Sequence, residues 1–587
     1  MDVYHKILGK YWGYPAFRPL QEDIIHSVCA GRDTLGLMPT GGGKSVTFQV
    51  PALAMEGICL VITPLIALMR DQVDNLRRVG IKATAVYSGM GRQEIVAELE
   101  NCVSGQYKFL YVSPERLATG LFREKLQAMN VCLLVVDESH CISQWGYDFR
   151  PSYLHIADIR EQLPGVPVLA LTATATPEVV DDIQRRLLFK EKNVFRTSFV
   201  RPNLAYIVRR TEDKLGTLAY ILGKVPGTAI VYTRSRKQTK EAALFLQQAG
   251  ISADFFHAGL NREEKAIRQH RWKNNECRVM VATNAFGMGI DKPDVRLVVH
   301  LDMPGSLEEY FQEAGRVGRD SRKAFAVALC TDTDSFHLKK RIDDQLLFGK
   351  LIVYPLFHLK KRIDDEFPEK KLIGKVYEAL GDYFRIQEGQ GKDIVHNFEL
   401  TDFYSTCQLP PLQIHHALKL LELSGYIEYC EAIDESSFQT APQITYTHPR
   451  VRTNALIIPS SAYEERRERM KKRISKVVEY MNGIHICRSR LLLSYFGEKN
   501  TEDCGCCDVC LSKNDSGLNN RDFNAIRDLL LRLLSTRQLL PVTTLLPLLP
   551  FPEEKIVTTI RFLAEHDKRF YLKEGKVGIF TDIVNAR

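Results

Sequence analysis

The chain has 587 residues, of which 45% are hydrophobic, 26% charged and 9% aromatic. At about 150 residues per domain this length predicts roughly four domains, and the composition excludes wholesale disorder. Lys and Arg outnumber Asp and Glu by 79 to 71, so the net charge of +8 permits a polyanionic partner without establishing one.

The lack of an apolar targeting segment and the distribution of the cysteines favour a soluble, non-secreted, cytoplasmic protein. No run approaches about 18 consecutive apolar residues, and the amino-terminal segment has no apolar signal core. Most of the 14 cysteines are scattered along the chain, which suits a reducing compartment, whereas the cluster between residues 504 and 510 suits a metal.

Short β-branched runs alternate with longer amphipathic ones between about residues 30 and 300. The first set, from ICLVITP to VLALTAT, ends near Thr176, and the second, from TAIVYT to RLVVHLD, begins near Gly227. This alternation predicts parallel sheets covered by helices on both faces. We therefore expect an α/β protein with two lobes, over residues 1–205 and 206–335.

A glycine-rich segment, PTGGGKS at 39–45, lies between the predicted strand DTLGLM and the predicted helix VTFQVPALAM. Backbone amides of such a turn and the following helix amino terminus bind phosphate, while the lysine reaches the terminal phosphates and the serine ligates Mg²⁺. The predicted nucleotide-binding residues are Thr40, Gly41, Gly42, Gly43, Lys44 and Ser45. Met38 stands where the usual motif opens with glycine, and a bare glycine-rich turn is the alternative.

Two carboxylates, Asp137 and Glu138, follow the apolar run Leu133 to Val136. At the end of a strand in a lobe with a phosphate loop, Asp137 is expected to hold Mg²⁺ through water. Glu138 is expected to orient or deprotonate the attacking water. The alternative is a pair of solvated carboxylates on a loop.

Arg316 and Arg319 stand in the segment QEAGRVGR at 312–319, three residues apart, and would share one face if helical. Arginines that project into a cleft between lobes stabilise charge on the transferring phosphoryl group, so hydrolysis would depend on lobe closure. Taken alone, the pair would be interpreted as a solvated or salt-bridged surface.

The accessory half begins with a repeat: FHLKKRIDD occurs at 336–344 and again at 357–365. We interpret residues 336–368 as a linker with a tandem duplication or cloning scar, and a pair of basic helices on the DNA backbone is the alternative. Residues 369–435 resemble a winged helix that either binds duplex DNA or packs against the two α/β lobes. Helices and the hairpin RFYLKEGKVGIF predict a second winged helix over residues 516–587.

The cysteine spacing predicts a closed, tetrahedral, structural Zn²⁺ site within a helical region over residues 460–515. The predicted ligands are Cys487, Cys504, Cys507 and Cys510. Cys506 is an extra thiol that would compete for the metal, and a reactive dithiol is the main alternative.

The ordered motifs between residues 10 and 325 resemble those of superfamily 2 helicases, and specifically of the RecQ family of DNA helicases. The series is WGYPAFRPLQ (12–21), PTGGGKS, TPLIALMRDQ (63–72), SPER (113–116), DESH (137–140), LTATAT (171–176), FHAGL (256–260), ATNAFGMGI (282–290) and QEAGRVGR. DESH replaces DEAH, GRVGRD replaces GRAGRD, and Ser321 replaces glycine, but none of these departures removes a charged group. The module at 369–435 departs from the commonest RecQ order, in which the zinc region follows the motor directly.

The resemblance implies further site residues. Tyr14 and Arg18 would sandwich adenine, Gln21 would hydrogen-bond its edge, and Gln312 would contact the nucleotide. The segment SQWGYDFR (143–150) matches the family's aromatic-rich loop, which couples single-strand binding to hydrolysis. Its predicted DNA-binding residues are Trp145, Phe149 and Arg150, which offer stacking faces and a phosphate or cation–π contact. From composition alone, a tryptophan is more often a core residue.

The resemblance thus implies an ATP- and Mg²⁺-dependent helicase that moves 3′ to 5′ on single-stranded DNA and unwinds duplex DNA in recombination and repair. Expected partners are single-stranded and duplex DNA, a single-strand-binding protein and other repair factors, with no membrane and, in a bacterium, a nucleoid location. An RNA-directed or non-unwinding translocase ATPase is the main alternative. A DNA-binding scaffold with a decayed motor is a third hypothesis.

Overall fold

The computed structural model describes most of the chain in two compact units. The first comprises residues 1–204, 208–482 and 492–500, and the second comprises the remainder. The described residues are 2–39, 41–87, 89–146, 148–286, 292–330, 366–397, 399–430, 442–460, 462–483, 485–499, 501–514, 520–535, 539–567 and 569–579. Both copies of the repeat lie outside them, so the interpretation of residues 336–365 stays a prediction.

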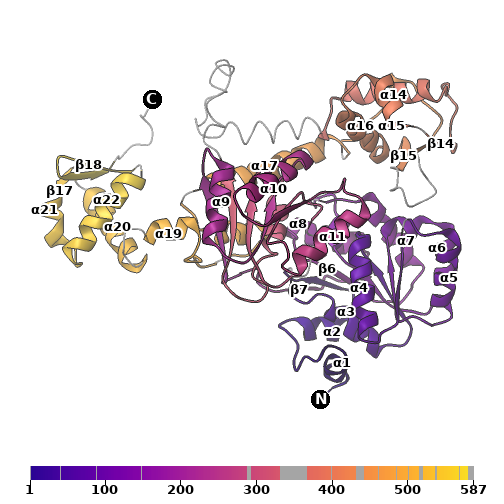
Figure 1. The fold of residues 1–587 in the computed structure, drawn as a ribbon, viewed down its shortest axis with the longest axis horizontal. Coiled ribbons are helices and arrows are strands. Elements are labelled where there is room, and N and C mark those ends of the chain that lie inside the picture. The colour runs from indigo at the N-terminus through magenta and orange to yellow at the C-terminus, as the bar shows by residue number, and fades with distance from the viewer. Residues whose placement is uncertain are drawn as a thin grey trace. The chain divides into compact units, whose positions relative to one another are not determined.

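A seven-stranded parallel sheet forms the first lobe, in the spatial order β3-β4-β2-β5-β6-β1-β7. Figure 1 draws this lobe in indigo and purple, with β6 and β7 labelled. The strands are β1 (Thr34–Leu37), β2 (Ile58–Ile62), β3 (Ala83–Val86), β4 (Phe109–Val112), β5 (Val131–Val136), β6 (Val168–Thr172) and β7 (Val194–Arg196). The central strands are apolar and buried because helices cover both faces of the sheet. Strands β5, β6 and β1 are neighbours, so their carboxyl ends meet at one edge.

Helices surround this sheet in the order that the sequence predicts. They are α1 (Val3–Trp12), α2 (Gln21–Cys29), α3 (Val46–Ala54), α4 (Ile66–Arg78), α5 (Arg92–Val103), α6 (Gly120–Gln127), α7 (His155–Glu161) and α8 (Pro177–Arg186). Three 3₁₀ helices, η1 (Pro114–Ala118), η2 (Ser139–Ile142) and η3 (Pro151–Leu154), complete the lobe.

A six-stranded sheet in the order β10-β11-β9-β12-β13-β8 forms the second lobe. Its strands are β8 (Leu204–Arg210), β9 (Thr228–Tyr232), β10 (Ala253–Phe256), β11 (Val279–Ala282), β12 (Val295–His300) and β13 (Ala324–Cys330). Its helices are α9 (Lys214–Lys224), α10 (Arg236–Gln248), α11 (Arg262–Lys273) and α12 (Leu307–Ala314). The expectation of two parallel-sheet α/β lobes is confirmed.

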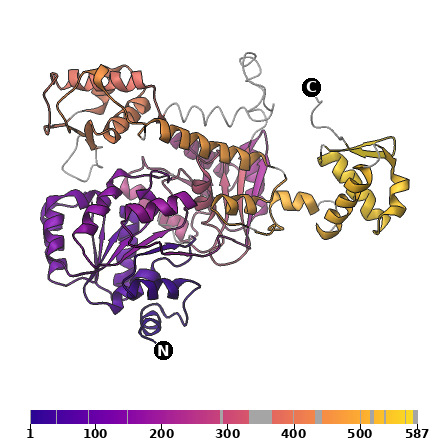
Figure 2. The same cartoon turned by 180° about the vertical axis from the view of Figure 1, so that it is seen from behind.

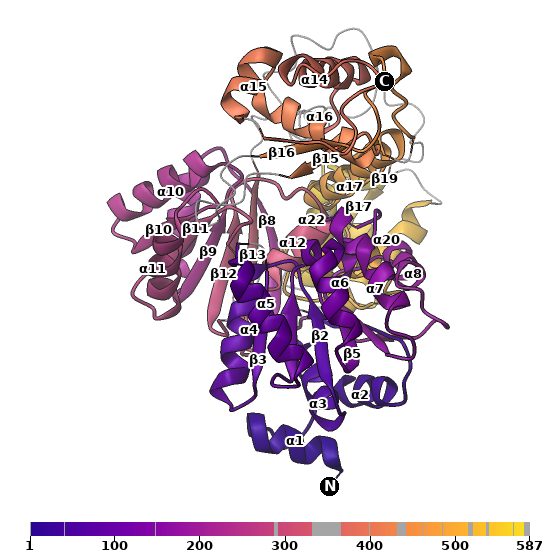
Figure 3. The same cartoon turned by 90° about the vertical axis from the view of Figure 1, so that its right-hand side faces the viewer.

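An inserted module follows, with the helix and strand order of a winged helix. It consists of α14 (Lys370–Tyr383), β14 (Val395–Asn397), α15 (Leu400–Cys407), α16 (Pro411–Leu423), β15 (Ile427–Cys430) and β16 (Gln443–Tyr446). The strands form an antiparallel sheet in the order β14-β16-β15, and Figure 3 shows α14, α15 and α16 on one side of β15 and β16.

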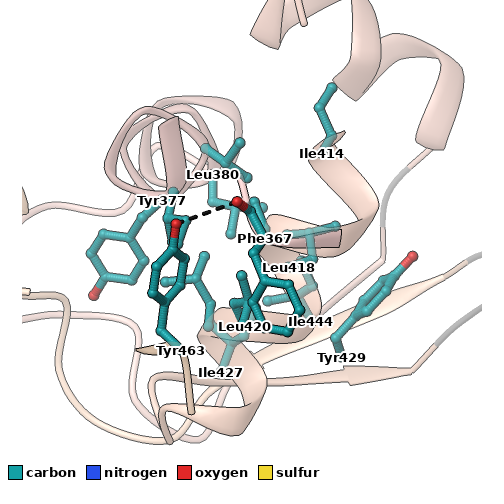
Figure 4. Packing of buried hydrophobic residues seen from close by; sticks show 14 of the residues in the cluster. Phe367, Tyr377, Leu380, Ile414, Leu418, Leu420, Ile427, Tyr429, Ile444 and Tyr463 are labelled. Carbon is teal, nitrogen blue, oxygen red and sulfur yellow. Dashed lines mark hydrogen bonds between the residues drawn. The ribbon is translucent and has the colours of Figure 1, made fainter. Parts of the chain in front are cut away.

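The core of the inserted module continues into the long helix α17 (Glu464–Asn482), because Met470, Ile474 and Val478 belong to the same buried cluster as the module's apolar residues. Figure 4 shows part of this cluster, with Leu418 of α16 and Ile444 of β16 at its centre. The Tyr463 hydroxyl donates to the backbone oxygens of Phe367 (3.3 Å) and Pro368 (3.0 Å), which ties the residues just before α17 to the start of the module.

The second unit contains the cysteine cluster and a carboxyl-terminal module with the same element order as the inserted one. Helix α18 (Arg488–Tyr495) begins in this unit, and α19 (Asp508–Asn514) follows the cysteines. The module comprises α20 (Asn520–Ser535), β17 (Leu540–Pro541), α21 (Val542–Leu545), α22 (Glu553–His566), β18 (Phe570–Lys573) and β19 (Lys576–Ile579), drawn in yellow in Figure 2. Its sheet order, β17-β19-β18, repeats that of the inserted module, so the two modules share one topology, and their assignment as winged helices stays a prediction. In the described part of the chain, no helix has both the length and the apolar character that a membrane crossing requires.

Candidate functional site

The glycine-rich turn lies directly after β1 and leads into α3. Gly41 and Gly43 have positive φ angles of 82° and 79°, a region that favours glycine. A Cβ at Gly42 would lie 2.9 Å from the Pro39 backbone oxygen, so the tight turn also excludes a side chain there. Thr40 lies outside the described residues. The predicted turn between strand and helix is therefore present, with backbone geometry that suits a phosphate.

Arg18 and Gln21, expected to contact adenine, both hydrogen-bond to this turn. Arg18 Nη1 donates to the Gly41 oxygen at 2.7 Å, and Gln21 Nε2 donates to the Gly43 oxygen at 2.9 Å. The Arg18 backbone N–H donates to Gln21 Oε1 at 2.8 Å, which couples the two residues. The side chain of Tyr14 is 51% exposed. Arg18 and Gln21 therefore lie beside the glycine-rich turn. The expected stacking of adenine between Tyr14 and Arg18 stays a prediction.

Asp137 and Glu138 follow β5, and Glu138 Oε1 lies 3.7 Å from Lys44 Nζ. Glu138 has a left-handed backbone, with φ 47° and ψ 45°, which is unusual for a residue with a Cβ and is typical of strained functional positions. Its amide donates to Asp137 Oδ1 at 2.9 Å. The structure thus brings the lysine of the glycine-rich turn and the carboxylates of DESH into one site.

The pKa values of the two carboxylates are shifted in opposite directions. Burial raises the pKa of Asp137 to about 6, although Lys44 opposes this change. Burial also acts to raise the pKa of Glu138, but Lys44, His140 and Arg316 outweigh it and hold that pKa below its ordinary value. Glu138 is therefore an ionised carboxylate at neutral pH, as a proton acceptor must be.

His140 is a site residue that the sequence analysis did not single out. Its Nδ1 lies 3.4 Å from Glu138 Oε2 and 3.0 Å from Thr172 Oγ1, at the end of β6. Burial lowers the pKa of His140, while Glu138 acts to raise it. The signal for this contact was in the sequence, because DESH directly follows β5, LTATAT begins in the last two residues of β6, and these strands are neighbours.

Arg316 and Arg319 reach the same region from the second lobe. A Cβ at Gly41 would lie 3.3 Å from Arg319 Cγ, so this side chain lies against the glycine-rich turn. Arg316 is only 5% exposed and contributes to the lowered pKa of Glu138. The expectation of a shared helical face is wrong, because α12 ends at Ala314 and the chain turns at Gly318 with a φ of 60°.

The aromatic-rich loop follows η2. Trp145 is 45% exposed, which excludes the alternative of a core tryptophan. Arg150 Nη2 pairs with Asp148 Oδ2 at 3.1 Å, and its Nη1 donates to the Pro64 oxygen at 3.3 Å, so this guanidinium joins the loop to the TPLIALMRDQ segment. The loop therefore offers an open stacking face at Trp145, while Arg150 is held by protein groups.

A cavity of about 290 Å³ lies between this loop and the arginine segment. Asp148 and Arg150 line it from the loop, and Gln312 and Arg316 line it from the second lobe. Gln312, predicted to contact the nucleotide, is 8% exposed. The predicted DNA-contacting loop and the predicted charge-stabilising segment thus share one cavity.

The four predicted zinc ligands form one cluster, with all four sulfurs within 4.8 Å of one another. Cys507 Sγ lies 3.9 Å from Cys487 Sγ, and Cys504 Sγ lies 4.0 Å from Cys510 Sγ. Zn–S bonds of about 2.3 Å place the sulfurs of a tetrahedron about 3.8 Å apart, so the cluster fits Zn²⁺.

Residues around the cysteines support the zinc cluster. Arg488 forms a two-pronged ion pair with Asp508, with Nε to Oδ1 at 3.0 Å and Nη2 to Oδ2 at 2.8 Å. The Cys504 and Cys510 backbone amides donate to the sulfurs of Cys487 and Cys507 at 3.3 Å, as expected for thiolates. Cys506 is not among the clustered ligands found in the described residues.

Comparison with known proteins is consistent with this arrangement. Three families match: DEAD/DEAH box helicase over residues 18–183, helicase conserved C-terminal domain over 213–321 and RecQ zinc-binding over 450–511. The "Probable ATP-dependent DNA helicase RecS" of Bacillus subtilis is 40% identical over 58% of this chain and 69% of its own length.

A second relative and a solved structure give further matches. The "ATP-dependent DNA helicase RecQ" of Bacillus subtilis is 44% identical, and the match covers 56% of this chain and 56% of that protein. The chain therefore spans little more than half of this relative. A structure of S. cerevisiae Dbp5 bound to RNA and ADP BeF3 aligns with 58% of this chain and 90% of that chain, at 17% identity and a TM-score of 0.47.

Proposed function

Because the chain belongs to the RecQ family of DNA helicases, we propose that it is an ATP- and Mg²⁺-dependent helicase that moves 3′ to 5′ on single-stranded DNA and unwinds duplex DNA. The observation that carries this proposal is the meeting of Lys44, Glu138 and Arg319 around one glycine-rich turn. A phosphate-binding lysine, an ionised carboxylate and an arginine from a second lobe are the groups that nucleoside triphosphate hydrolysis requires.

In this mechanism the two lobes divide the chemistry. Lys44 and the backbone of the glycine-rich turn bind the phosphates, and Glu138 orients the attacking water and accepts its proton. Arg319 and Arg316 stabilise the charge that develops on the transferring phosphoryl group. Because the arginines come from the second lobe, hydrolysis follows lobe closure and product release follows opening, which alternates the grip on the strand.

The residues present fit a bound Mg²⁺. The Ser45 hydroxyl and the Asp137 carboxylate are oxygen donors of the kind that Mg²⁺ prefers. Burial raises the pKa of Asp137 to about 6, a change that a cation beside the carboxylate would reverse. When bound, Mg²⁺ neutralises charge on the phosphate oxygens. We assign Zn²⁺ a structural role at the four-cysteine cluster.

Electrostatics favours the carboxyl-terminal module as the one that engages duplex DNA. Between residues 520 and 579 it carries 10 Lys and Arg against 7 Asp and Glu. Between residues 366 and 446 the inserted module carries 6 Lys and Arg against 13 Asp and Glu, a net charge of −7 that opposes a polyanion. The inserted module therefore serves the motor by packing, whereas the carboxyl-terminal one contacts the duplex.

Strand displacement tests the proposal. Forked, 3′-tailed and 5′-tailed duplexes of equal length are incubated with ATP and Mg²⁺, with Lys44→Ala as the inactive control. Unwinding of 3′-tailed and forked DNA, but not of 5′-tailed DNA, is expected. ATPase stimulation by ribo-oligonucleotides but not deoxyribo-oligonucleotides would overturn the DNA assignment, and stimulation without strand separation would indicate a non-unwinding translocase. The family membership also leads us to propose a role in recombination and repair, with a single-strand-binding protein and other repair factors as partners and, in a bacterium, a nucleoid location.

A further inference from the structure

Helix α17 presents a row of arginines to the aromatic-rich loop. Arg466, Arg469 and Arg473 are spaced by three and four residues, so they share one helix face. Arg473 Nη2 donates to the backbone oxygens of Trp145 and Gly146, both at 2.7 Å. The Arg469 guanidinium carbon lies 4.7 Å from the centre of the Trp145 ring. Arg473 thus fixes the loop backbone, while Arg469 reaches the ring.

Arg466 stands over the second aromatic ring of the loop, with its guanidinium carbon 5.6 Å from the centre of the Phe149 ring. Between the loop and α17 lies a cavity of about 140 Å³, lined by all three arginines and also by Glu366 and Phe367. This volume far exceeds the roughly 15 Å³ that one water needs.

Several guanidinium donors at this cavity have no acceptor among the described residues. Arg466 Nη1 and Arg469 Nε and Nη2 are buried and make no hydrogen bond there. A buried, charged donor without an acceptor is costly, and such groups mark sites for a missing ligand. Burial, followed by repulsion from the neighbouring arginines, lowers the pKa of Arg466 against the attraction of Glu366. An anion with several acceptor oxygens would supply the hydrogen-bond acceptors that these guanidinium groups lack.

The charges around the cavity fit one phosphodiester. Asp148 is neutralised by Arg150, so it adds no net charge. Glu366 lines the cavity, and Glu465 lies 3.7 Å from Arg469 Nη1. Three guanidinium groups against these two carboxylates leave one net positive charge, which a backbone phosphate balances.

We propose that Arg466 and Arg469 bind one backbone phosphate of single-stranded DNA beside the stacking faces of Trp145 and Phe149. The proposal deepens the proposed function and rests on it. A phosphate at this position and a base on Trp145 are adjacent parts of one strand, and the combination of a basic groove with aromatic platforms reads no sequence.

The inserted module preorganises this site. Met470, Ile474 and Val478 anchor α17 in the module's core, so the arginines project from a fixed helix. At its other end α17 packs against α12, with the Tyr480 and Tyr310 ring centres 5.3 Å apart. One helix therefore contacts the aromatic loop of the first lobe, the helix that precedes Arg316 in the second lobe and the inserted module.

The salt dependence of single-strand binding tests the site. The affinity of the full chain for oligo(dT) is measured by fluorescence anisotropy over a salt series, for wild type, Arg466→Gln/Arg469→Gln and the control Lys472→Gln. Lys472 is an exposed residue of the same helix, so it loses the same charge type without lining the cavity. The slope of log K against log salt changes by about 0.7 for each phosphate contact on a single strand. We expect the double variant to lose about 0.7 from this slope and the control to keep the wild-type value.

The possible outcomes distinguish failure of the phosphate site from failure of the proposed helicase function. A wild type that does not bind oligo(dT) would refute the proposed function, whereas equal slopes for wild type and double variant would refute the phosphate site alone. If inorganic phosphate raises the melting temperature of wild type but not of the double variant, and the slopes are equal, the site holds free phosphate and the DNA assignment is wrong. An abasic oligonucleotide should retain the slope difference, because it keeps its phosphates. The single variant Arg466→Gln leaves the contacts of Arg469 and Arg473 to Trp145 in place. It replaces the double variant in the salt series if the double variant has a lower melting temperature than wild type.

Discussion

Replacing Trp145 with alanine separates a DNA-contacting aromatic from a structural one. The ring is 45% exposed and packs on one side against Arg469. A fully buried tryptophan costs about 3–5 kcal/mol when truncated, so one with nearly half of its surface in water should cost roughly 2 kcal/mol, including about 0.5–1 kcal/mol for the cation–π contact. We therefore expect a melting temperature only a few degrees below wild type.

The effect on single-strand binding should be larger than the effect on stability. Loss of a stacking platform removes about 1–3 kcal/mol of binding free energy. At about 1.4 kcal/mol for each tenfold change, the oligonucleotide concentration for half-maximal ATPase stimulation should rise by about 5- to 150-fold. DNA-independent turnover should stay near wild type, because Lys44 and Glu138 are untouched.

The assay titrates oligo(dT) into an ATPase reaction and records the melting temperature of the same preparation. Tyr220→Ala is the matched control, since Tyr220 on α9 is also an exposed aromatic, 56% accessible, with cationic neighbours at Arg209 and Lys224. The reasoning fails if Trp145→Ala reaches half-maximal ATPase stimulation at the same oligo(dT) concentration as wild type. It also fails if DNA-independent turnover and DNA-stimulated turnover of the variant fall by the same factor.

Four other substitutions address the remaining parts of the molecule. Glu138→Gln should keep ATP and DNA affinity while turnover falls by about 10²- to 10⁴-fold in a steady-state assay, and turnover within a few-fold of wild type would contradict the role. Arg319→Ala should lower turnover by about 10³-fold with little change in ATP affinity, whereas equal losses would indicate ground-state binding. Cys507→Ser should reduce zinc content from about one ion per chain towards zero by atomic absorption, and retained zinc would refute the four-thiolate site. Ile474→Ala, 2% exposed, should lower the free energy of unfolding by about 2–5 kcal/mol in urea, and a cost below 1 kcal/mol would argue against a shared core.

The two lobes were predictable because their information is local. The β-branched runs form buried parallel strands, and the polar motifs lie at the ends of these runs. The local sequence therefore predicts both the strands and the edge of the sheet at which the site residues lie. Lys44 and Glu138 could be assigned to one site because β1 and β5 end at the same edge. The zinc ligands were predictable for the same reason, since three of the four fall within seven residues.

The arginine row of α17 was not predictable in this way. Arg473 contacts Trp145 across 328 positions of sequence, and nothing local to either segment specifies that pairing. The spacing of Arg466, Arg469 and Arg473 indicated one helix face, but only the packed structure shows that this face meets the loop. The spacing of Arg316 and Arg319 would place them on one face only in a helix, but α12 ends at Ala314 and the backbone at Gly318, between the two arginines, has a positive φ.

The core shared by α17 and the inserted module makes the two a single cooperative unit in folding. A helix whose apolar face belongs to another module's core opens only when that core opens, so its amides should exchange with solvent at the module's rate rather than at the rate of a surface helix. A destabilised inserted module would then loosen α17 through local unfolding, and the aromatic loop would lose its backbone clamp at Arg473. The acidic module would in this way set the lifetime of the conformation in which Arg473 holds the aromatic-rich loop.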